Sequence, residues 1–448
     1  MTKTLKQRAV RSGSWVIFGH LFSQVLRLGS NLILTRLLVP EMFGVMAIVN
    51  VIMFGLAMFS DVGLLQNIVQ SKRGEEPAYL NTAWTIQIIR GFIIFLIALA
   101  LSGGLHLLGK AGFLSAETVY GNTELPLILA IVSVTSVISS FNSIHILLLN
   151  RKLMMGKLVT IELLSQVIGL ILMLIWAWYQ RDIWALVFGG IVSAIVKVVL
   201  SHSVNLGERC KFYWDKSAVH EIFHFGKWIF LSSILGFLLS QGDRLLLGLW
   251  VSPETLGVYS IAFFLAMALK DVLKKIVSSV FYPMLSEIAR DKPNELKNTY
   301  YKIRTKVDFI AMFIAGLMAS TGHVFVEILY DERYQNAGWM LEILSISIVF
   351  IGYSVAGACL MAIGHVKSNM WIMLAATIFL YVSVPIAFIS YGLSGALIMI
   401  SLNYIIDIPM TFYMMRKYGL LSLKKEFRML PFLFVFYATG KCLLHLFQ

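Results

Sequence analysis

Charged side chains lie within several long apolar stretches of this sequence, where a charge must be hydrated or given a partner. The basic ones are natural counterions for a phosphate-type anion in a partly dry cavity. Lys270 and Lys274 are four residues apart and therefore share a helix face. Internal pairing, as between Arg27 and Asp61, and snorkelling towards water are the alternatives. The predicted cationic anion-binding residues are Arg27, Arg90, Arg244, Lys270 and Lys274.

Acidic residues within the apolar stretches are fewer, and they are the groups that ion-coupled transporters use to bind Na⁺ or a proton. Glu342 and Asp407 are candidates for such coupling. Asp61 lies close to the end of its stretch, where capping or gating is the expected role.

Other motifs do not indicate an enzyme or a metal protein. Gly104 to Lys110 approaches a nucleotide-binding P-loop, but Ala111 stands where Ser or Thr must reach Mg²⁺. The three cysteines are too far apart for a metal motif, and the nine histidines show no paired metal spacing. We therefore expect no catalytic residue, no metal site and no cofactor beyond a driving ion, either Na⁺ or a proton.

Composition points to a polytopic membrane protein. Of 448 residues, 58% are apolar and 14% are charged, and the mean hydropathy is +0.80, whereas soluble chains average about 45–50% apolar. The first apolar run lacks a cleavage site and is interpreted as an uncleaved helix. Runs long enough to cross a bilayer predict twelve spans and a weaker thirteenth segment, at roughly 14–34, 43–65, 81–108, 125–149, 158–179, 183–203, 228–250, 256–285, 307–329, 337–363, 369–390, 395–415 and 429–447.

The distribution of the 37 Lys and Arg residues predicts the orientation. With the N-terminus inside, 25 lie on the inner side and four in outer loops, so the N-terminus is expected in the cytoplasm. The same bias accounts for the net charge of +13 without nucleic acid as a partner.

A short motif occurs twice, 213 residues apart. LVPEMFGVMAI begins at Leu38 and VSPETLGVYSI at Val251, and both follow the pattern Pro-Glu-x-x-Gly. Proline and an acidic residue suit the first turn of a helix, and a glycine one turn later permits close helix contact. Six predicted spans separate the copies, which indicates a parallel repeat of two six-helix lobes. The predicted domains are 1–206, 207–417 and a C-terminal tail, 418–448, with a thirteenth helix.

Four stretches carry a family resemblance: LTRLLVPEMFGVMAIVNV, FSDVGLLQNIVQSK, LGVYSIAFFLAMALKDVLKKIVSSVFYPMLSEIARD and LYDERYQNAGWMLEILS. They resemble the Wzx-type polysaccharide flippases of the multidrug/oligosaccharidyl-lipid/polysaccharide (MOP) superfamily. The similarity is greatest to colanic-acid and teichuronic-acid exporters. It implies an all-α, V-shaped fold of two lobes around a cavity in the bacterial inner membrane. It also implies alternating-access movement of an undecaprenyl-pyrophosphate-linked oligosaccharide across that membrane, working with glycan polymerase and chain-length machinery.

Two other functions stay open from the residues alone. A membrane glycan polymerase or ligase needs a long outer loop with catalytic Arg or His, whereas the longest expected outer loop, about 109–124, holds only Lys110 as a basic residue. A cation-coupled multidrug exporter of the same superfamily needs acidic groups in its cavity, whereas the charges within the spans of this chain are mostly basic.

Overall fold

The computed structural model describes residues 5–204, 206 and 209–447, and every regular element in this part of the chain is helical. Contacts divide the chain into two units, which are considered separately. The first comprises Met1–Phe237 and Leu247–Gly257, and the second comprises Leu238–Leu246 and Val258–Gln448. The domain boundaries at 206/207 and 417/418 stay predictions.

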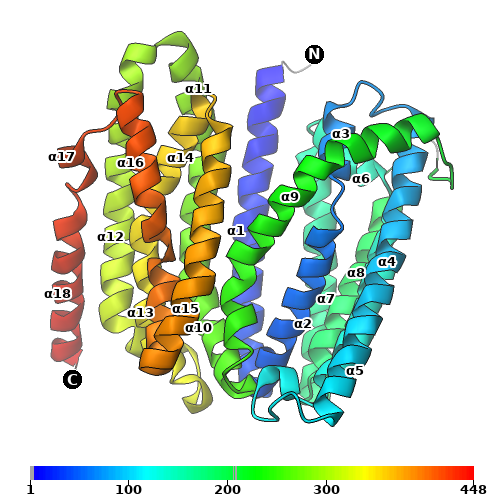
Figure 1. Ribbon diagram of the computed structural model, residues 1–448, viewed down its shortest axis with the longest axis horizontal. Coiled ribbons are helices and arrows are strands. Elements are labelled where there is room, and N and C mark those ends of the chain that lie inside the picture. The colour runs from blue at the N-terminus through cyan, green and yellow to red at the C-terminus, as the bar shows by residue number, and fades with distance from the viewer. Residues whose placement is uncertain (1–4, 205, 207–208, 448) are drawn as a thin grey trace. The chain divides into compact units, whose positions relative to one another are not determined.

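The first unit is built from long apolar helices joined by short connections. Its helix α4 packs side by side with α5, as α7 does with α8 (Figure 1). Its helices are α1 (Leu5–Leu37), α2 (Pro40–Phe59), α3 (Leu64–Gln70), α4 (Pro77–Lys110), α5 (Leu125–Ser140), α6 (His145–Arg151), α7 (Met155–Tyr179), α8 (Trp184–His202) and most of α9 (Lys216–Leu247), with a short 3-10 turn at Val119–Gly121.

The second unit contains more interrupted helices. It consists of α10 (Pro253–Ile276), a π-helical segment η2 (Val277–Phe281), α11 (Tyr282–Asp291), α12 (Leu296–Leu329), α13 (Ala337–Ser345), a 3-10 segment η5 (Ile346–Ile351), α14 (Gly352–Ala362), α15 (Val366–Leu402), a 3-10 segment η6 (Asn403–Ile406), α16 (Asp407–Lys417), α17 (Leu423–Glu426) and α18 (Leu430–Phe447), with short 3-10 turns at Pro293–Glu295 and Glu332–Tyr334. The first residues of α10, up to Gly257, group with the first unit.

The predicted all-α multi-pass fold is confirmed, although the number of spans depends on how breaks are counted. Among the described residues, ten helices are long and apolar enough to cross a membrane, or eleven if the pair α5 and α6, bent by 66°, is one span. Thirteen were expected with the tail, and two differences reduce that number to eleven. Helix α1 is long, but Gln24, Arg27 and Asn31 make it too polar. Helices α15 and α16 count as one, although the backbone of Gly392 (φ +63°) breaks α15 where the eleventh and twelfth spans were expected to separate.

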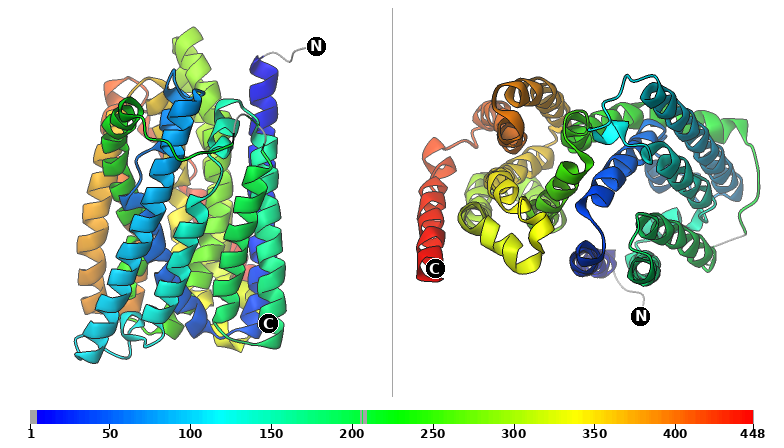
Figure 2. Two further views of the ribbon diagram at one scale, coloured as in Figure 1. Left: turned by 90° about the vertical axis from the view of Figure 1, so that its right-hand side faces the viewer. Right: turned by 90° about the horizontal axis from the view of Figure 1, so that it is seen from below.

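The tail forms the expected thirteenth helix, α18, which packs along α12 (Figure 2). Phe309 and Phe313 of α12 meet Phe436 edge to face, with ring centroids 5.5 and 5.1 Å apart. The tail is also held by a buried ion pair, because Nη1 of Arg304 lies 2.8 Å from Oε2 of Glu426. Tyr301 donates a hydrogen bond of 2.9 Å to the same carboxylate.

The two Pro-Glu-x-x-Gly turns meet each other within the first unit. Pro40 and Pro253 each open a helix. A Cβ added to Gly44 would overlap the carbonyl oxygen of Pro253, and a Cβ added to Gly257 would overlap the carbonyl oxygen of Pro40. The contact is thus reciprocal, and glycine is required in both copies because each backbone touches the other.

An extended segment, residues 209–215, runs from the end of the first six spans into α9. Alternate backbone N–H groups, those of Lys211, Tyr213 and Asp215, donate to side chains of Asn81, Thr85 and Thr82 on α4. Arg73 pairs with Asp215 at 2.7 Å, and this contact lowers the pKa of the Asp215 carboxyl to about 2. The connection to α9 is therefore fixed against the first unit by side chains of α3–α4.

Candidate functional site

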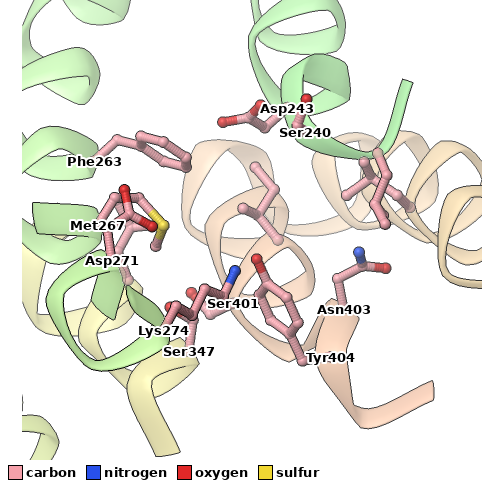
Figure 3. A pocket seen from close by; sticks show the side chains of 14 residues that line it. Ser240, Asp243, Phe263, Met267, Asp271, Lys274, Ser347, Ser401, Asn403 and Tyr404 are labelled. Carbon is pink, nitrogen blue, oxygen red and sulfur yellow. The ribbon is translucent and has the colours of Figure 1, made fainter. Parts of the chain in front are cut away.

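A cavity of about 240 Å³ lies inside the second unit, at the depth of its apolar spans. Its walls come from α9, α10, α13 and α15 and from the 3-10 segments η5 and η6. Such breaks in helices within a membrane are tolerated where the backbone lines a cavity. Figure 3 shows Asp243 and Ser240 at one end of the cavity, and Lys274, Ser347, Ser401, Asn403 and Tyr404 towards the other.

The acidic groups of the cavity come from two helices. Asp243, which is only 4% exposed, lies on α9 and accepts a short hydrogen bond from the hydroxyl of Tyr259 on α10. Asp271 lines the cavity one turn along from Met267 on α10. These two carboxylates place negative charge where apolar side chains would be expected.

Two lysines of α10 face the same region. Lys274 lines the cavity and is exposed, whereas Lys270 is 1% exposed. The Nζ atom of Lys270 lies 3.3 Å from the centroid of the Tyr404 ring, and that of Lys274 lies 5.8 Å from it. A ring face at this distance stabilises an ammonium group through a cation–π interaction.

Several buried polar atoms around the cavity have no hydrogen-bond partner in the protein. They are the Nζ of Lys270, the hydroxyls of Ser347 and Ser401, and carbonyl or carboxylate oxygens of Asn403 and Asp407. Unsatisfied polar groups cost about 1–3 kcal/mol each when dry. A cavity of this volume holds several waters at ~30 Å³ each, so we infer that it is hydrated.

The remaining predicted basic residues lie outside this cavity lining. Arg244 is on α9 beside Asp243, but its Nη1 donates to Gln241 at 2.8 Å and its guanidinium lies 4.6 Å from the ring of Phe263. Arg27 is an exposed residue of α1, in the first unit. The structure therefore brings Lys270 and Lys274 together at the ring of Tyr404, whereas Arg244 contacts Phe263.

Arg90 has a structural task that the sequence did not suggest. Its Nε donates to Ser60 at 2.9 Å, and its Nη2 donates to the carbonyl of Ala57 at 2.5 Å. Both acceptors belong to the end of α2, where the last carbonyls of a helix lack partners and a cation is favoured. Arg90 of α4 thus caps the C-terminus of α2.

The three acidic residues expected to take part in coupling or gating lie in different surroundings. Asp61 follows the end of α2 and accepts from the backbone N–H of Gly63 at 2.9 Å. Glu342 of α13 pairs with His323 of α12 at 2.6 Å. Asp407 begins α16 directly after η6, and it is the one of the three with a buried oxygen near the cavity.

Sequence reasoning missed the neutral half of the site. Ser347, Ser401, Asn403 and Tyr404 line the cavity, yet none was a candidate. A signal was available, because polar residues and a proline interrupt an otherwise apolar span, a pattern that accompanies a helix break. These residues are Asn403, Tyr404, Asp407 and Pro409.

The fold and the hydrated, charged cavity within its spans define a class, that of multi-pass membrane transporters. The chain belongs to the polysaccharide biosynthesis protein family, whose model matches residues 33–338. Among curated relatives, "Lipopolysaccharide biosynthesis protein WzxC" of Escherichia coli (strain K12) is 22% identical over 345 residues, covering 77% of this chain and 67% of the relative. "Succinoglycan biosynthesis transport protein ExoT" of Rhizobium meliloti (strain 1021) is 22% identical over 349 residues, covering 78% and 68%.

Solved structures show the same fold. "Lipid II flippase MurJ, inward closed conformation" matches with a TM-score of 0.70 at 16% identity, covering 94% of this chain and 92% of the flippase. The inward-facing conformation of a multidrug resistance MATE family transporter of the MOP superfamily matches with a TM-score of 0.64 at 13% identity, covering 88% and 94%. The resemblance to Wzx-type flippases is confirmed. Family and fold are those of transporters, which speaks against the polymerase or ligase alternative.

Proposed function

We propose that this protein moves an undecaprenyl-pyrophosphate-linked oligosaccharide from the inner to the outer leaflet of the bacterial inner membrane. The relatives are named for lipopolysaccharide and succinoglycan biosynthesis, and the solved neighbour is a lipid II flippase. The observation that carries the proposal is the match of the polysaccharide family model over most of the chain.

The basic side chains supply the contacts for the substrate's pyrophosphate in this proposal. Lys274 lines the cavity of the second unit and is exposed there, which supports its part in the proposal. Arg27 of α1, in the first unit, stays a candidate from the sequence. Each charge-assisted contact contributes about 1.5–3 kcal/mol. Arg90 was proposed with them, but it already caps α2, and we assign it to positioning that helix. Arg244, which contacts Gln241 and the ring of Phe263, stays a candidate.

The proposed mechanism is alternating access of the two halves, driven by a Na⁺ or proton gradient. The N-terminus is proposed to lie in the cytoplasm. Among Asp61, Glu342 and Asp407, the buried and unsatisfied oxygen of Asp407 makes it the strongest coupling candidate. Glycan polymerase and chain-length proteins are proposed partners on the outer side, because they consume the flipped product.

Reconstitution into liposomes tests the proposal. Purified protein with undecaprenyl-pyrophosphate-linked oligosaccharide should expose the glycan to an added glycosidase when an ion gradient is imposed, and without ATP. A cationic drug in place of the glycan serves as the comparison substrate. Drug transport with no glycan movement would favour the exporter, and glycan movement that requires ATP would contradict the proposed energy source.

A further inference from the structure

Lys270 is an unusual side chain for a membrane-spanning helix. It lies near the C-terminal end of α10, is 1% exposed, and makes no hydrogen bond through Nζ. An unpaired charge in such surroundings is expensive, and Lys side chains of spans usually snorkel to water. This side chain instead lies over the ring of Tyr404, at 3.3 Å. Its position is therefore built into the fold.

The groups that face Lys270 come from three elements. Asp271 and Lys274 share its helix, Tyr404 belongs to η6, and Asp407 begins α16. Asp271, Asp407 and Lys274 are the charged groups that act electrostatically on the ammonium of Lys270.

Asp243 and Arg244 of α9 complete the set of charges in and around the cavity. Asp243 lines it, whereas Arg244 does not but lies 4.6 Å from the ring of the lining residue Phe263. Asp243, Asp271 and Asp407 supply three negative charges, and Arg244, Lys270 and Lys274 supply three positive ones. The set is neutral when all are ionised. Without the Lys270 ammonium it carries one uncompensated negative charge, in a hydrated space of about 240 Å³.

We propose that Lys270 provides the cation of this cavity from within the chain, so that transport needs no bound metal cation and is coupled to a proton carried by Nζ. This inference rests on the proposed transport function. In the charged state the ammonium balances the carboxylates and contacts the Tyr404 ring. In the other state one N–H bond breaks, the proton passes to a cavity water, and the electron pair remains on Nζ. Reprotonation from the opposite side of the membrane restores the ammonium and closes the cycle.

The cation–π contact favours this assignment over a passive role. A neutral amine gains little from the face of an aromatic ring, whereas an ammonium is attracted to it. The site is thus shaped for the charged form. Without the ammonium, the cavity would keep its carboxylate, hydroxyl and amide oxygens and one uncompensated negative charge. Such oxygens are the ligands that hard cations prefer, so removing the charge should turn the cavity into a site for a small monovalent cation.

Sodium-dependent stability is the first test. Purified protein in nanodiscs without substrate is heated in NaCl and in choline chloride at equal ionic strength. The wild type should show the same Tm in both, and Lys270→Gln should be several degrees more stable in NaCl, because a ligand that binds only the folded state raises its stability. Lys275→Gln, on the same helix, is the matched control and should behave like the wild type.

A double variant makes the test decisive even if Lys270→Gln folds poorly. Lys270→Gln with Asp407→Asn restores neutrality, so it should fold better than the single variant and lose the NaCl effect. A NaCl-specific gain in the wild type, or none in Lys270→Gln, would overturn the proposal. If Lys270→Gln does not fold, a double variant that also fails to fold would overturn the proposal as well.

Proton coupling is tested separately, in proteoliposomes. Lys270→Arg keeps the positive charge but cannot release a proton, so it should remain insensitive to Na⁺ and lose at least tenfold of the transport driven by a pH gradient. Wild-type rates from Lys270→Arg would refute the proton step. If neither protein moves glycan, the proposed function fails, while the outcome of the NaCl experiment stands.

Discussion

At the scale of single residues, the structure sorts the basic side chains by what they already contact. Lys274 is exposed at a cavity, Lys270 is enclosed by the same cavity wall, and Arg90 closes the end of a helix. The sequence pattern predicted an anion-binding role for all three residues, because it shows how far along a span a side chain lies but not towards which neighbours it points. Function and stability should therefore respond differently to their removal.

Substitution of Lys274 and Arg90 by alanine should give opposite results. Lys274→Ala removes an exposed cavity charge, so stability should hold while glycan binding falls about ten- to a hundredfold. Arg90→Ala leaves the end of α2 uncapped and should cost about 1–3 kcal/mol of stability, with normal transport per folded molecule. Thermal unfolding and glycan movement are measured on the same preparations. A stable, transport-deficient Arg90→Ala variant would return this residue to the substrate site.

At the scale of elements, the spans were predictable but their interruptions were not. Hydropathy gave α4, α7 and α8 within a few residues of their observed bounds, because a span needs a minimum apolar length. The 3-10 segments η5 and η6 follow from contacts between distant helices, and single-sequence periodicity carries no information on these. Both segments contribute side chains to the cavity, so the site was the least predictable part of the fold.

The reciprocal glycine contact leads to a prediction at this scale. Gly44→Ala and Gly257→Ala each place a methyl group against a backbone carbonyl, and overpacking of this kind costs about 1–3 kcal/mol. Gly190→Ala is the control, because a Cβ there meets nothing within 4 Å and alanine favours a helix by about 1 kcal/mol. Thermal unfolding in detergent measures all three. Equal Tm values for Gly257→Ala and Gly190→Ala would contradict the close approach.

The docking of the C-terminal tail depends on one carboxylate. Glu426 of α17 is 6% exposed and pairs with Arg304, which also binds Asp308 at 3.1 Å. Glu426→Ala leaves Arg304 short of a partner, and breaking a buried pair costs about 3–5 kcal/mol. Glu295→Ala, which removes an exposed pair with Lys292, should cost less than about 1 kcal/mol. Protease sensitivity of residues 418–447 should rise only in Glu426→Ala, and equal sensitivity in both variants would show that the tail is held by α18 alone.

At the scale of the whole molecule, the multi-pass all-α fold class was accessible from the number and length of the apolar runs, and the family from the resemblance of four sequence stretches to Wzx-type flippases. Orientation in the membrane is the corresponding prediction. In a variant without Cys210, Cys359 and Cys442, a cysteine at Glu254 should react with an impermeant maleimide added outside. A cysteine at Lys292, also exposed, should react only after the membrane is opened. Labelling of residue 254 solely from the cytoplasm would reverse the topology.

The reciprocal contact of the two turns has a consequence for the history of the chain. In a symmetric dimer, each subunit uses the same patch to bind the other, so one residue serves both sides. Gly44 against Pro253 and Gly257 against Pro40 follow this rule within a single polypeptide. A six-helix ancestor that paired with its own copy would have needed this glycine and this proline once. A gene that arose by duplication and fusion would have to keep them twice, because backbone atoms cannot be changed to relieve a clash created in the other half. This explains why these few residues are still recognisably alike 213 positions apart, while the sequences around them have diverged.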